Sequence, residues 1–376
     1  MMTSRERLLA VLHREMPDCV PCCPDISNMV PCRLTGKPFW DIYVYQNPPL
    51  WKAYIDALRY FDIDGGFELE LSLSDLSGDK PEWERRIVRR DRDGSFVTQE
   101  YCRQTGEWSK RVEVHTRDNP PAWGIRPEKI GLPAVPKTWE AVNGIRQWPA
   151  GLELWKLIKK EMGDQGVIGM SSGGVTCLIS GPEEVCAYYD DPSPFYQRRQ
   201  QALRRVETVM NRIAKLDEKP DFLFCGSSGS LIWQTPEILR ELSLPVLKKA
   251  AEMACDLGIP THAHSCGPEK ELVRMAAEET KLTVIDPLEI PPMGDCDLKE
   301  LKGRYGHKLV LKGNLHTTEV MLRGSVDVVA RAARQAIDDA ARGGGFILST
   351  GDQCGRDTPD ENIRMMVDAA RTYGRY

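Results

Sequence analysis

The sequence lacks the features that would place it in a membrane, on a nucleic acid or in the secretory pathway. No apolar run approaches the roughly 20 residues that a membrane-spanning helix needs. The net charge is −5, so no positive field favours a nucleic acid. Met1–Arg7 mixes acidic and basic residues and begins an amphipathic helix, which is unlike a signal peptide. We therefore expect a cytoplasmic protein that binds neither membranes nor nucleic acid.

A disulfide framework is also not expected. The 376 residues include 12 cysteines, which without an export signal should be reduced thiols and mostly small buried hydrophobic residues. Cys19 and Cys22 have the Cys-x-x-Cys spacing found in zinc and redox sites. No second pair with this spacing accompanies it, and the neighbouring Val20 and Pro21 favour a buried strand.

The sequence does contain a regular alternation of strand-like and helix-like segments from Trp139 onward. Six predicted strands lie in this part of the chain: Val167–Ser171, Phe222–Cys225, Pro260–His264, Leu282–Asp286, Leu309–Lys312 and Gly345–Ser349. Two more precede it, Cys19–Ile26 and Ile63–Leu71. The absence of Gly-x-Gly-x-x-Gly after the first strand argues against a dinucleotide-binding sheet. Eight strand–helix units over roughly 250 residues favour an α/β fold, the (β/α)8 TIM barrel.

A different pattern follows the second predicted strand. Arg85–Val114 alternates charged and apolar residues around Asp93-Gly94 and Thr105-Gly106, which are two hairpin turn signals. A proline-rich connection comes next. We therefore predict an antiparallel β-hairpin insertion with its connection at residues 80–136, inside a single barrel domain that spans 1–376.

The predicted strand Pro260–His264 leads into the most informative motif of the chain. Side chains at positions i and i+2 of a strand point to one face, so His262, His264 and Cys266 share a face. His264 and Cys266 provide half of a soft metal site. His262 lies about 6–7 Å deeper along the strand. At that depth a hydrogen-bonding neighbour of the site or a core histidine is expected rather than a ligand.

A third ligand can come from the end of the eighth predicted strand. Reacting groups of such barrels collect at the C-terminal ends of the strands, where Cys354 could meet His264 and Cys266. One imidazole and two thiolates suit Zn²⁺, and three protein ligands leave one position open for a substrate. The alternative is that both cysteines are inert loop thiols and that His264 is a hydrogen-bonded polar residue.

Several motifs together carry a resemblance to a known superfamily. Besides His264–Gly267 they are Asp286–Glu289, Lys312–Asn314, Gly343–Leu348 and Thr358–Ile363. With them the chain resembles the uroporphyrinogen decarboxylase superfamily, strongly over its C-terminal half and loosely over its N-terminal half. The resemblance implies a single barrel, in a superfamily with two branches, the true decarboxylases and the cobalamin-dependent methyltransferases.

The two branches differ in their substrate-binding and metal-binding residues, and this sequence can be compared with each. The decarboxylases bind a polycarboxylate porphyrinogen with an arginine-bearing segment after the first strand. Here Cys22–Met29 contains no arginine, and Asp25 has the wrong charge for such a substrate. The methyltransferases carry His-x-Cys and a distant cysteine as zinc ligands, a pattern that His264, Cys266 and Cys354 match. The resemblance therefore implies a zinc-dependent methyltransferase that works with cobalamin carried by a separate corrinoid protein.

Other polar residues after the predicted strands are weaker candidates. Glu289 and Asp352 could act as a fourth zinc ligand or as a catalytic base, but each could instead cap a helix or pair with an arginine. Candidate contacts to the substrate or corrinoid are Asn28, Trp233, His262, Asn314 and His316.

The resemblance leaves the substrate and the direction of methyl transfer open. Tryptophans in the insertion, in its connection and after the fourth strand could line a pocket for an aryl methyl ether, or could pack the insertion onto the barrel. They are Trp83, Trp108, Trp123 and Trp233. We expect O-demethylation of such an ether to Co(I). Transfer from methylcobalamin to a thiol or folate, a metal-free porphyrinogen-type decarboxylase and a metal-free binding protein are the alternatives. The oligomeric state is open, with a homodimer among the options.

Overall fold

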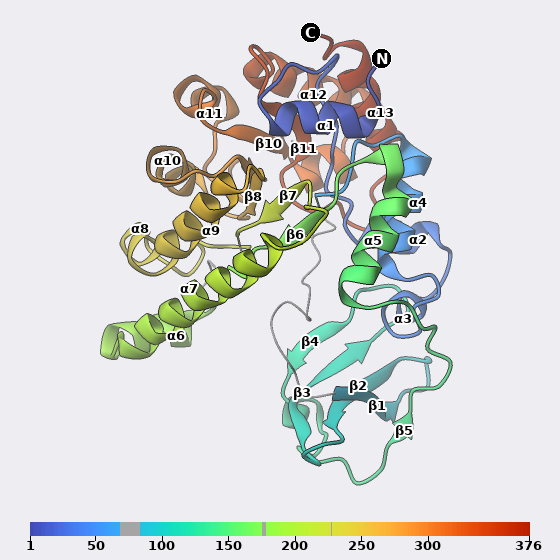
Figure 1. The fold of residues 1–376 in the computed structure, drawn as a ribbon. Coiled ribbons are helices and arrows are strands. Elements are labelled where there is room, and N and C mark those ends of the chain that lie inside the picture. The colour runs from blue at the N-terminus through green and yellow to red at the C-terminus, as the bar shows by residue number, and fades with distance from the viewer. Residues whose placement is uncertain (68–82, 175–177, 227) are drawn as a thin grey trace. The chain divides into compact units, whose positions relative to one another are not determined.

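A computed structural model describes residues 1–67, 83–174, 178–226 and 228–376 (Figure 1). The chain forms two compact units. The parallel-sheet unit comprises residues 1–25, 58–77 and 151–376, and the antiparallel-sheet unit comprises residues 26–57 and 78–150. The assignment of the whole chain to one domain stays a prediction. No helix in the described part of the chain is long and apolar enough to cross a membrane.

Six parallel strands form the sheet of the parallel-sheet unit, in the order β11-β10-β9-β8-β7-β6 (Figure 1). Their bounds are β6 Gly169–Ser171, β7 Phe222–Phe224, β8 Thr261–His264, β9 Val284–Asp286, β10 Val310–Leu315 and β11 Phe346–Thr350. Each lies within or beside a strand predicted from the apolar runs. The predicted α/β class is therefore confirmed, and so is the parallel arrangement of strands that alternate with helices.

One short extended segment continues the sheet beyond each edge strand. Cys22 forms a parallel bridge with Leu348 of β11, and Gly65 forms one with Gly166, just before β6. The Asp64 N–H donates to the Cys22 carbonyl at 3.0 Å. These segments coincide with the first two predicted strands, of which residues 68–71 lie outside the described chain. Only isolated bridges form near Cys22, where the flanking prolines have no N–H for a ladder. Closure into an eight-stranded barrel stays a prediction.

Amphipathic helices pack on the sheet and on one another in chain order. The helices are α5 Gly151–Met162, α6 Pro182–Asp190, α7 Ser193–Ile213, α8 Pro236–Ile238, α9 Leu244–Asp256, α10 Lys270–Glu279, α11 Leu298–Tyr305, α12 Val326–Ala340 and α13 Asp360–Thr372. Helices α9, α10, α11, α12 and α13 contact each other successively (Figure 1). In α12, for example, Val329, Ala333, Ala336 and Ile337 repeat at helical spacing and are buried.

Helix α1, Ser4–Leu12, packs on the N-terminal end of the parallel sheet. It begins with a capping box in which Thr3 and Glu6 exchange side-chain and backbone hydrogen bonds. A continuous core joins this helix to the early residues of the strands. It contains Leu8, Val11, Leu12, Cys23, Phe67, Val167, Phe222, Val284, Val310 and Ile347. Apolar packing fills the N-terminal end of the sheet, so the polar residues of the strands collect at the other end.

The antiparallel-sheet unit contains five strands in the order β4-β3-β2-β1-β5. Strands β1 Trp83–Arg90, β2 Phe96–Cys102 and β3 Trp108–His115 are joined at the two turns predicted from Asp93-Gly94 and Thr105-Gly106. Both glycines have positive φ, as such turns require. The predicted hairpin insertion is confirmed. The proline-rich connection also supplies β4 Ala122–Ile125, and β5 Glu140–Ala141 follows the predicted end of the connection at residue 136. The sequence pattern predicted neither strand.

Helices precede the antiparallel strands in the chain. They are α2 Met29–Leu34, α3 Phe39–Tyr43 and α4 Leu50–Phe61. Within the antiparallel-sheet unit, Val44, Ile87 and Phe96 form a small core with Trp40 and Tyr45 against it. This unit therefore has its own apolar cluster, separate in composition from the core of the parallel sheet.

Candidate metal centre

The centre of the site is a carboxylate that joins two neighbouring parallel strands. His264 is the last residue of β8, and Asp286, the last residue of β9, is its partner in the strand register. The His264 Nδ1 lies 3.1 Å from Asp286 Oδ1. Because Nδ1 is engaged by the carboxylate, Nε2 is the ring nitrogen that remains for a ligand. A carboxylate behind an imidazole in this way is the usual support of a metal-binding histidine.

Two further side chains bind the same carboxylate. The His262 Nε2 lies 2.9 Å from Asp286 Oδ1, and the Lys312 Nζ donates to Oδ2. Burial alone would raise the pKa of Asp286, but the charge of Lys312 and the two imidazoles hold it well below its usual range. Asp286 is therefore a buried anion compensated by its neighbours.

The imidazoles respond in opposite directions. Burial lowers the pKa of His262, which is enclosed by the rings of Phe67, Phe222 and Phe224. Burial also disfavours the charged form of His264, but Asp286 outweighs this effect and raises the pKa of His264 well above its ordinary value. Of the two rings, His264 therefore attracts a cation, whether a proton or a metal ion.

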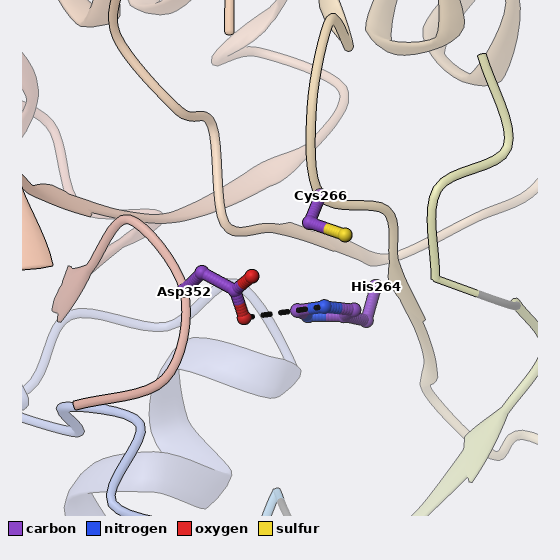
Figure 2. A group of neighbouring side chains, drawn as sticks. All are labelled: His264, Cys266 and Asp352. Atoms are coloured by element: carbon purple, nitrogen blue, oxygen red, sulfur yellow. Dashed lines mark ion pairs between the residues drawn. The ribbon is translucent and has the colours of Figure 1, made fainter. Parts of the chain in front are cut away.

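His264, Cys266 and Asp352 form a group with three different donor atoms (Figure 2). One ligand atom from each residue lies within 4.8 Å of those of the others. The Asp352 Oδ1 is 3.8 Å from His264 Nε2, and the Cys266 Sγ is 2.8 Å from the Ser228 hydroxyl. The group lies beyond the C-terminal ends of β8 and β11, where the sequence predicts reacting side chains.

This donor set fits zinc. Imidazole nitrogen, thiolate sulfur and carboxylate oxygen are its ordinary ligands, at about 2.0–2.3 Å. Donors at such distances in a tetrahedral site are about 3.5 Å apart, so the group would need to contract only modestly around an ion. Three donors also leave one position for a substrate. The His264–Asp286 pair supplies the outer support that zinc-bound imidazoles usually have.

Cys354, the third ligand predicted from the sequence, is not a member of this group in the described part of the chain. Its thiol is fully buried, and burial raises its pKa to about 12. Its N–H donates to the Asp25 carbonyl at 2.8 Å. Asp352 has a φ of 111°, a conformation that non-glycine residues rarely adopt. The structure thus presents Asp352 to His264 and turns Cys354 inward, so the ligand role of Cys354 stays a prediction.

Glu289 lies beside the group in the loop after β9. Its Oε2 accepts the Gly267 N–H at 2.5 Å, next to Cys266. Burial raises the pKa of Glu289, and the nearby carboxylate of Asp352 raises it further. Burial likewise raises the pKa of Asp352. Both carboxyl groups are consequently better able to hold a proton than exposed ones, as an acid–base role would need.

Asn314 and His316 lie at the end of β10 and have structural partners. The Asn314 Nδ2 donates to the Leu288 carbonyl at 2.9 Å. The His316 Nδ1 accepts the N–H groups of Thr318 and Glu319 and so caps the π-helical turn Thr317–Leu322. Both side chains also line a groove of about 440 Å³ with residues of α11 and α12.

The two other predicted contact residues are outside this cluster of polar groups. Trp233 follows β7 and is 42% exposed. Asn28 precedes α2 in the antiparallel-sheet unit, where its Oδ1 is buried without a hydrogen-bond partner among the described residues. Their roles in contacting a substrate or corrinoid stay predictions.

Asp286 and Lys312 begin two of the motifs that carry the resemblance, but neither residue has a role in the site predicted from the sequence, although both carry a usable signal. Asp286 ends a predicted strand directly beside the one that ends at His264. Lys312 is a charged residue at the end of the apolar run Leu309–Leu311. A lysine in a fully buried strand needs a counter-charge, and the adjacent strand offers Asp286.

Comparison with known proteins finds a family match for the C-terminal part of the chain. Residues 223–373 match the family described as uroporphyrinogen decarboxylase (URO-D). A curated uroporphyrinogen decarboxylase of Anaeromyxobacter dehalogenans is 30% identical over 138 residues, which make up 37% of this chain and 37% of that protein. The resemblance predicted from the motifs is therefore confirmed for this part of the chain.

A solved structure is similar over nearly the whole length. It is described as a methyltransferase from Methanosarcina mazei, with 18% identity and a TM-score of 0.59 over 99% of both chains. At this level of identity the similarity shows a shared fold. The similarity of fold includes the N-terminal residues, which the family match does not cover.

Proposed function

We propose that this protein is a zinc-dependent methyltransferase that moves a methyl group between a small substrate and the cobalamin of a separate corrinoid protein. The observation that carries the proposal is the group of His264, Cys266 and Asp352, with Asp286 behind the imidazole. The URO-D match of residues 223–373 and the fold shared with the Methanosarcina mazei methyltransferase support it.

His264, Cys266 and Asp352 would hold the zinc. When bound, zinc supplies a Lewis acid that can stabilise a leaving alkoxide or phenoxide, or increase the acidity of a thiol. Asp286 keeps Nε2 of His264 directed at the group. Glu289 holds Gly267, and with it the strand end that carries Cys266, through its Oε2. Its other oxygen can hold a proton for the substrate.

Exposed apolar side chains near these strand ends support a protein partner. Ile232 and Trp233 follow β7, and Met293 lies in the loop after β9. They are 48%, 42% and 58% exposed. Large apolar side chains that gather at loops around a site are typical of a surface that another molecule covers. The corrinoid protein that the proposed reaction requires would be that molecule.

We propose an aryl methyl ether as the methyl donor. The tryptophans of the antiparallel-sheet unit do not carry this choice. The ring centroid of Trp108, for example, lies 5.0 Å from that of Tyr101 in the same sheet, with the two rings tilted by 54°. The choice depends on chemistry, since an ether oxygen is a poor leaving group that benefits from a Lewis acid. Transfer from methylcobalamin to a thiol or folate uses the same centre in the other direction.

A methyl-transfer assay tests the proposal. Purified protein is mixed with reduced cobalamin, as a substitute for the corrinoid protein, and with methoxylated benzoates, and formation of methylcobalamin is followed by absorbance. We expect methyl transfer that Cys266→Ser abolishes and that Cys296→Ser, a change of a buried thiol outside the group, retains. Release of CO₂ from a porphyrinogen, without methyl transfer, would show a decarboxylase instead.

A further inference from the structure

Lys312 is one of the largest fully buried side chains of the protein and has no evident role in the proposed reaction. It lies within β10, where its neighbours Val310, Leu311 and Leu315 are apolar and buried. Its side chain is 2% exposed. Lysines are almost never buried so completely unless they are paired, because removing the ammonium group from water is costly. An apolar residue would fill the same position at no such cost.

The carboxylate that pairs with Lys312 is shared with the candidate metal centre. Asp286 Oδ2 accepts from Lys312 Nζ, while Oδ1 lies 2.9 Å from His262 Nε2 and 3.1 Å from His264 Nδ1. The strand register explains this arrangement. Val310 is paired with Val284, so the residues two positions further, Lys312 and Asp286, lie at the same level. The two oxygens therefore have different partners on different strands.

Different partners on the two oxygens fix the rotation of the carboxylate. With Lys312 on Oδ2, only Oδ1 faces the imidazoles, and it faces both of them. Without Lys312 the group could rotate about its Cβ–Cγ bond, a broad torsion, and present either oxygen or neither. His264 would then lose the partner that directs its Nε2 at Cys266 and Asp352.

We propose that Lys312 is a positioning residue of the metal centre, which locks Asp286 so that His264 presents Nε2 to the metal. The proposal rests on the proposed zinc site. It assigns to Lys312 a role that a structural ion pair would not have, because a purely structural pair would affect folding and leave metal affinity unchanged.

The chain offers a matched control for this distinction. Lys302 of α11 is also partly buried, and its Nζ donates to the carbonyl of Gly344, which precedes β11 at the opposite end of the sheet. Lys302→Met and Lys312→Met remove the same group from two ends of one unit. We expect Lys312→Met to weaken zinc binding by about 10–100-fold, the usual effect of losing an outer partner of a ligand. Lys302→Met should leave it unchanged.

The tautomer of His262 shows how the Asp286 carboxylate is oriented, and it can be measured in the metal-free protein. Its Nε2 faces the Asp286 carboxylate, which accepts, and its Nδ1 has no hydrogen-bond partner among the described residues, so we infer the Nε2–H tautomer. The chain has six histidines, few enough to resolve by ¹⁵N NMR of the imidazoles. In the metal-free protein, we expect one Nε2–H form of His262 in the wild type and mixed tautomers in Lys312→Met.

The experiment combines zinc competition against a chelator with the imidazole spectra, for the wild type, Lys302→Met, Lys312→Met and Lys312→Arg. Lys312→Arg retains a positively charged donor, so its zinc affinity should be closer to that of the wild type. It replaces Lys312→Met in the test if that variant does not fold. Unchanged zinc affinity and an unchanged His262 tautomer in Lys312→Met would overturn the proposal. Should the wild type bind no zinc, the proposed function fails, while the His262 tautomers still decide whether Lys312 locks Asp286.

Discussion

The two units of the protein use buried polar groups in opposite ways. In the parallel-sheet unit, the side chains of His262, His264 and Lys312, from two different strands, converge on Asp286 of a third. In the antiparallel-sheet unit, the Nε2 of the buried His115 lies 2.8 Å from the Thr98 hydroxyl and 3.6 Å from the Glu113 carboxylate, and the ring stacks on Phe96. Convergent charges in a low-dielectric interior are arranged for chemistry, whereas a single neutral ring is packing. The comparison therefore locates the candidate metal centre in the parallel-sheet unit, where the charged groups converge.

The largest effect should come from breaking a buried carboxylate network in the parallel-sheet unit. Asp286→Asn leaves Lys312 buried without its counter-charge. Near the other end of the sheet, Asp64→Asn removes the carboxylate shared by Arg7 and Arg371, of which Arg7 keeps a second partner in Asp18. We expect each to lower the free energy of unfolding by about 3–5 kcal/mol, measured by urea denaturation of the metal-free protein.

The two carboxylates should differ in their effect on metal binding. Asp286→Asn should weaken zinc binding as well, and Asp64→Asn should not, because only Asp286 contacts His264. Equal loss of zinc affinity in both variants would mean that general destabilisation, rather than the geometry of the centre, controls binding.

The next largest effect, on zinc affinity, distinguishes between Asp352 and Cys354 as the third ligand. Asp352→Asn should lower zinc affinity by at least about 100-fold, because losing a ligand exceeds the 10–100-fold effect of losing an outer partner. Cys354→Ala should retain zinc, since its buried thiol is outside the group. Isothermal titration of both variants measures the difference. The reverse result would restore the ligand set predicted from the sequence.

His115 of the antiparallel-sheet unit should give a moderate dependence of stability on pH. Burial lowers the pKa of His115 to about 4, so the unfolded chain binds its proton first as the pH falls below 6.5. Stability is therefore full above pH 6.5 and is lost progressively down to pH 4, by about 2 kcal/mol at pH 5. Urea denaturation at pH 7 and pH 5, followed by tryptophan fluorescence, measures the loss.

Tryptophan is a suitable probe because most of these residues belong to the antiparallel-sheet unit. Those in this unit are Trp40, Trp51, Trp83, Trp108, Trp123, Trp139 and Trp148. His115→Gln should abolish most of the difference between pH 7 and pH 5. The same pH dependence in His115→Gln would assign the titration to another group.

The smallest effect concerns the packing that holds β5 against β1. The Arg86 guanidinium lies 3.8 Å from the ring centroid of Tyr101 and 3.7 Å from that of Trp139. Arg86→Met should cost about 1 kcal/mol of unfolding free energy, the scale of a partly exposed cation–π pair. Arg111→Met, at an exposed position of β3, is the control. No difference between the two variants would show that the stacked rings contribute little.

The sequence predicts the six parallel strands and the hairpin turns because their signals are local. Apolar runs mark β6 to β11, and Asp93-Gly94 and Thr105-Gly106 mark the turns. The choice between Asp352 and Cys354 is different. Residues two apart share a face only in extended backbone, and the positive φ of Asp352 turns the chain where it leaves β11. That conformation depends on the surrounding contacts, so no motif reveals it.

The partnership of Asp286 and Lys312 is also beyond a local pattern. It depends on the register between β9 and β10, which the two strands acquire only when they pair. The motif around His264 and Cys266 could be found because both residues lie on one strand end. Asp286 and Lys312 each carry a signal in the sequence, but their pairing with each other and with His264 does not, since the partners lie 26 and 22 residues apart.

The most direct test of the account is the zinc content of the purified protein, measured by mass spectrometry after dialysis against metal-free buffer. We predict close to one zinc ion per chain in the wild type and in Cys296→Ser. His264→Gln and Cys266→Ser should retain almost none while remaining folded by circular dichroism. A wild type without zinc, or zinc retained by Cys266→Ser, would contradict the assignment of this strand end as the metal centre.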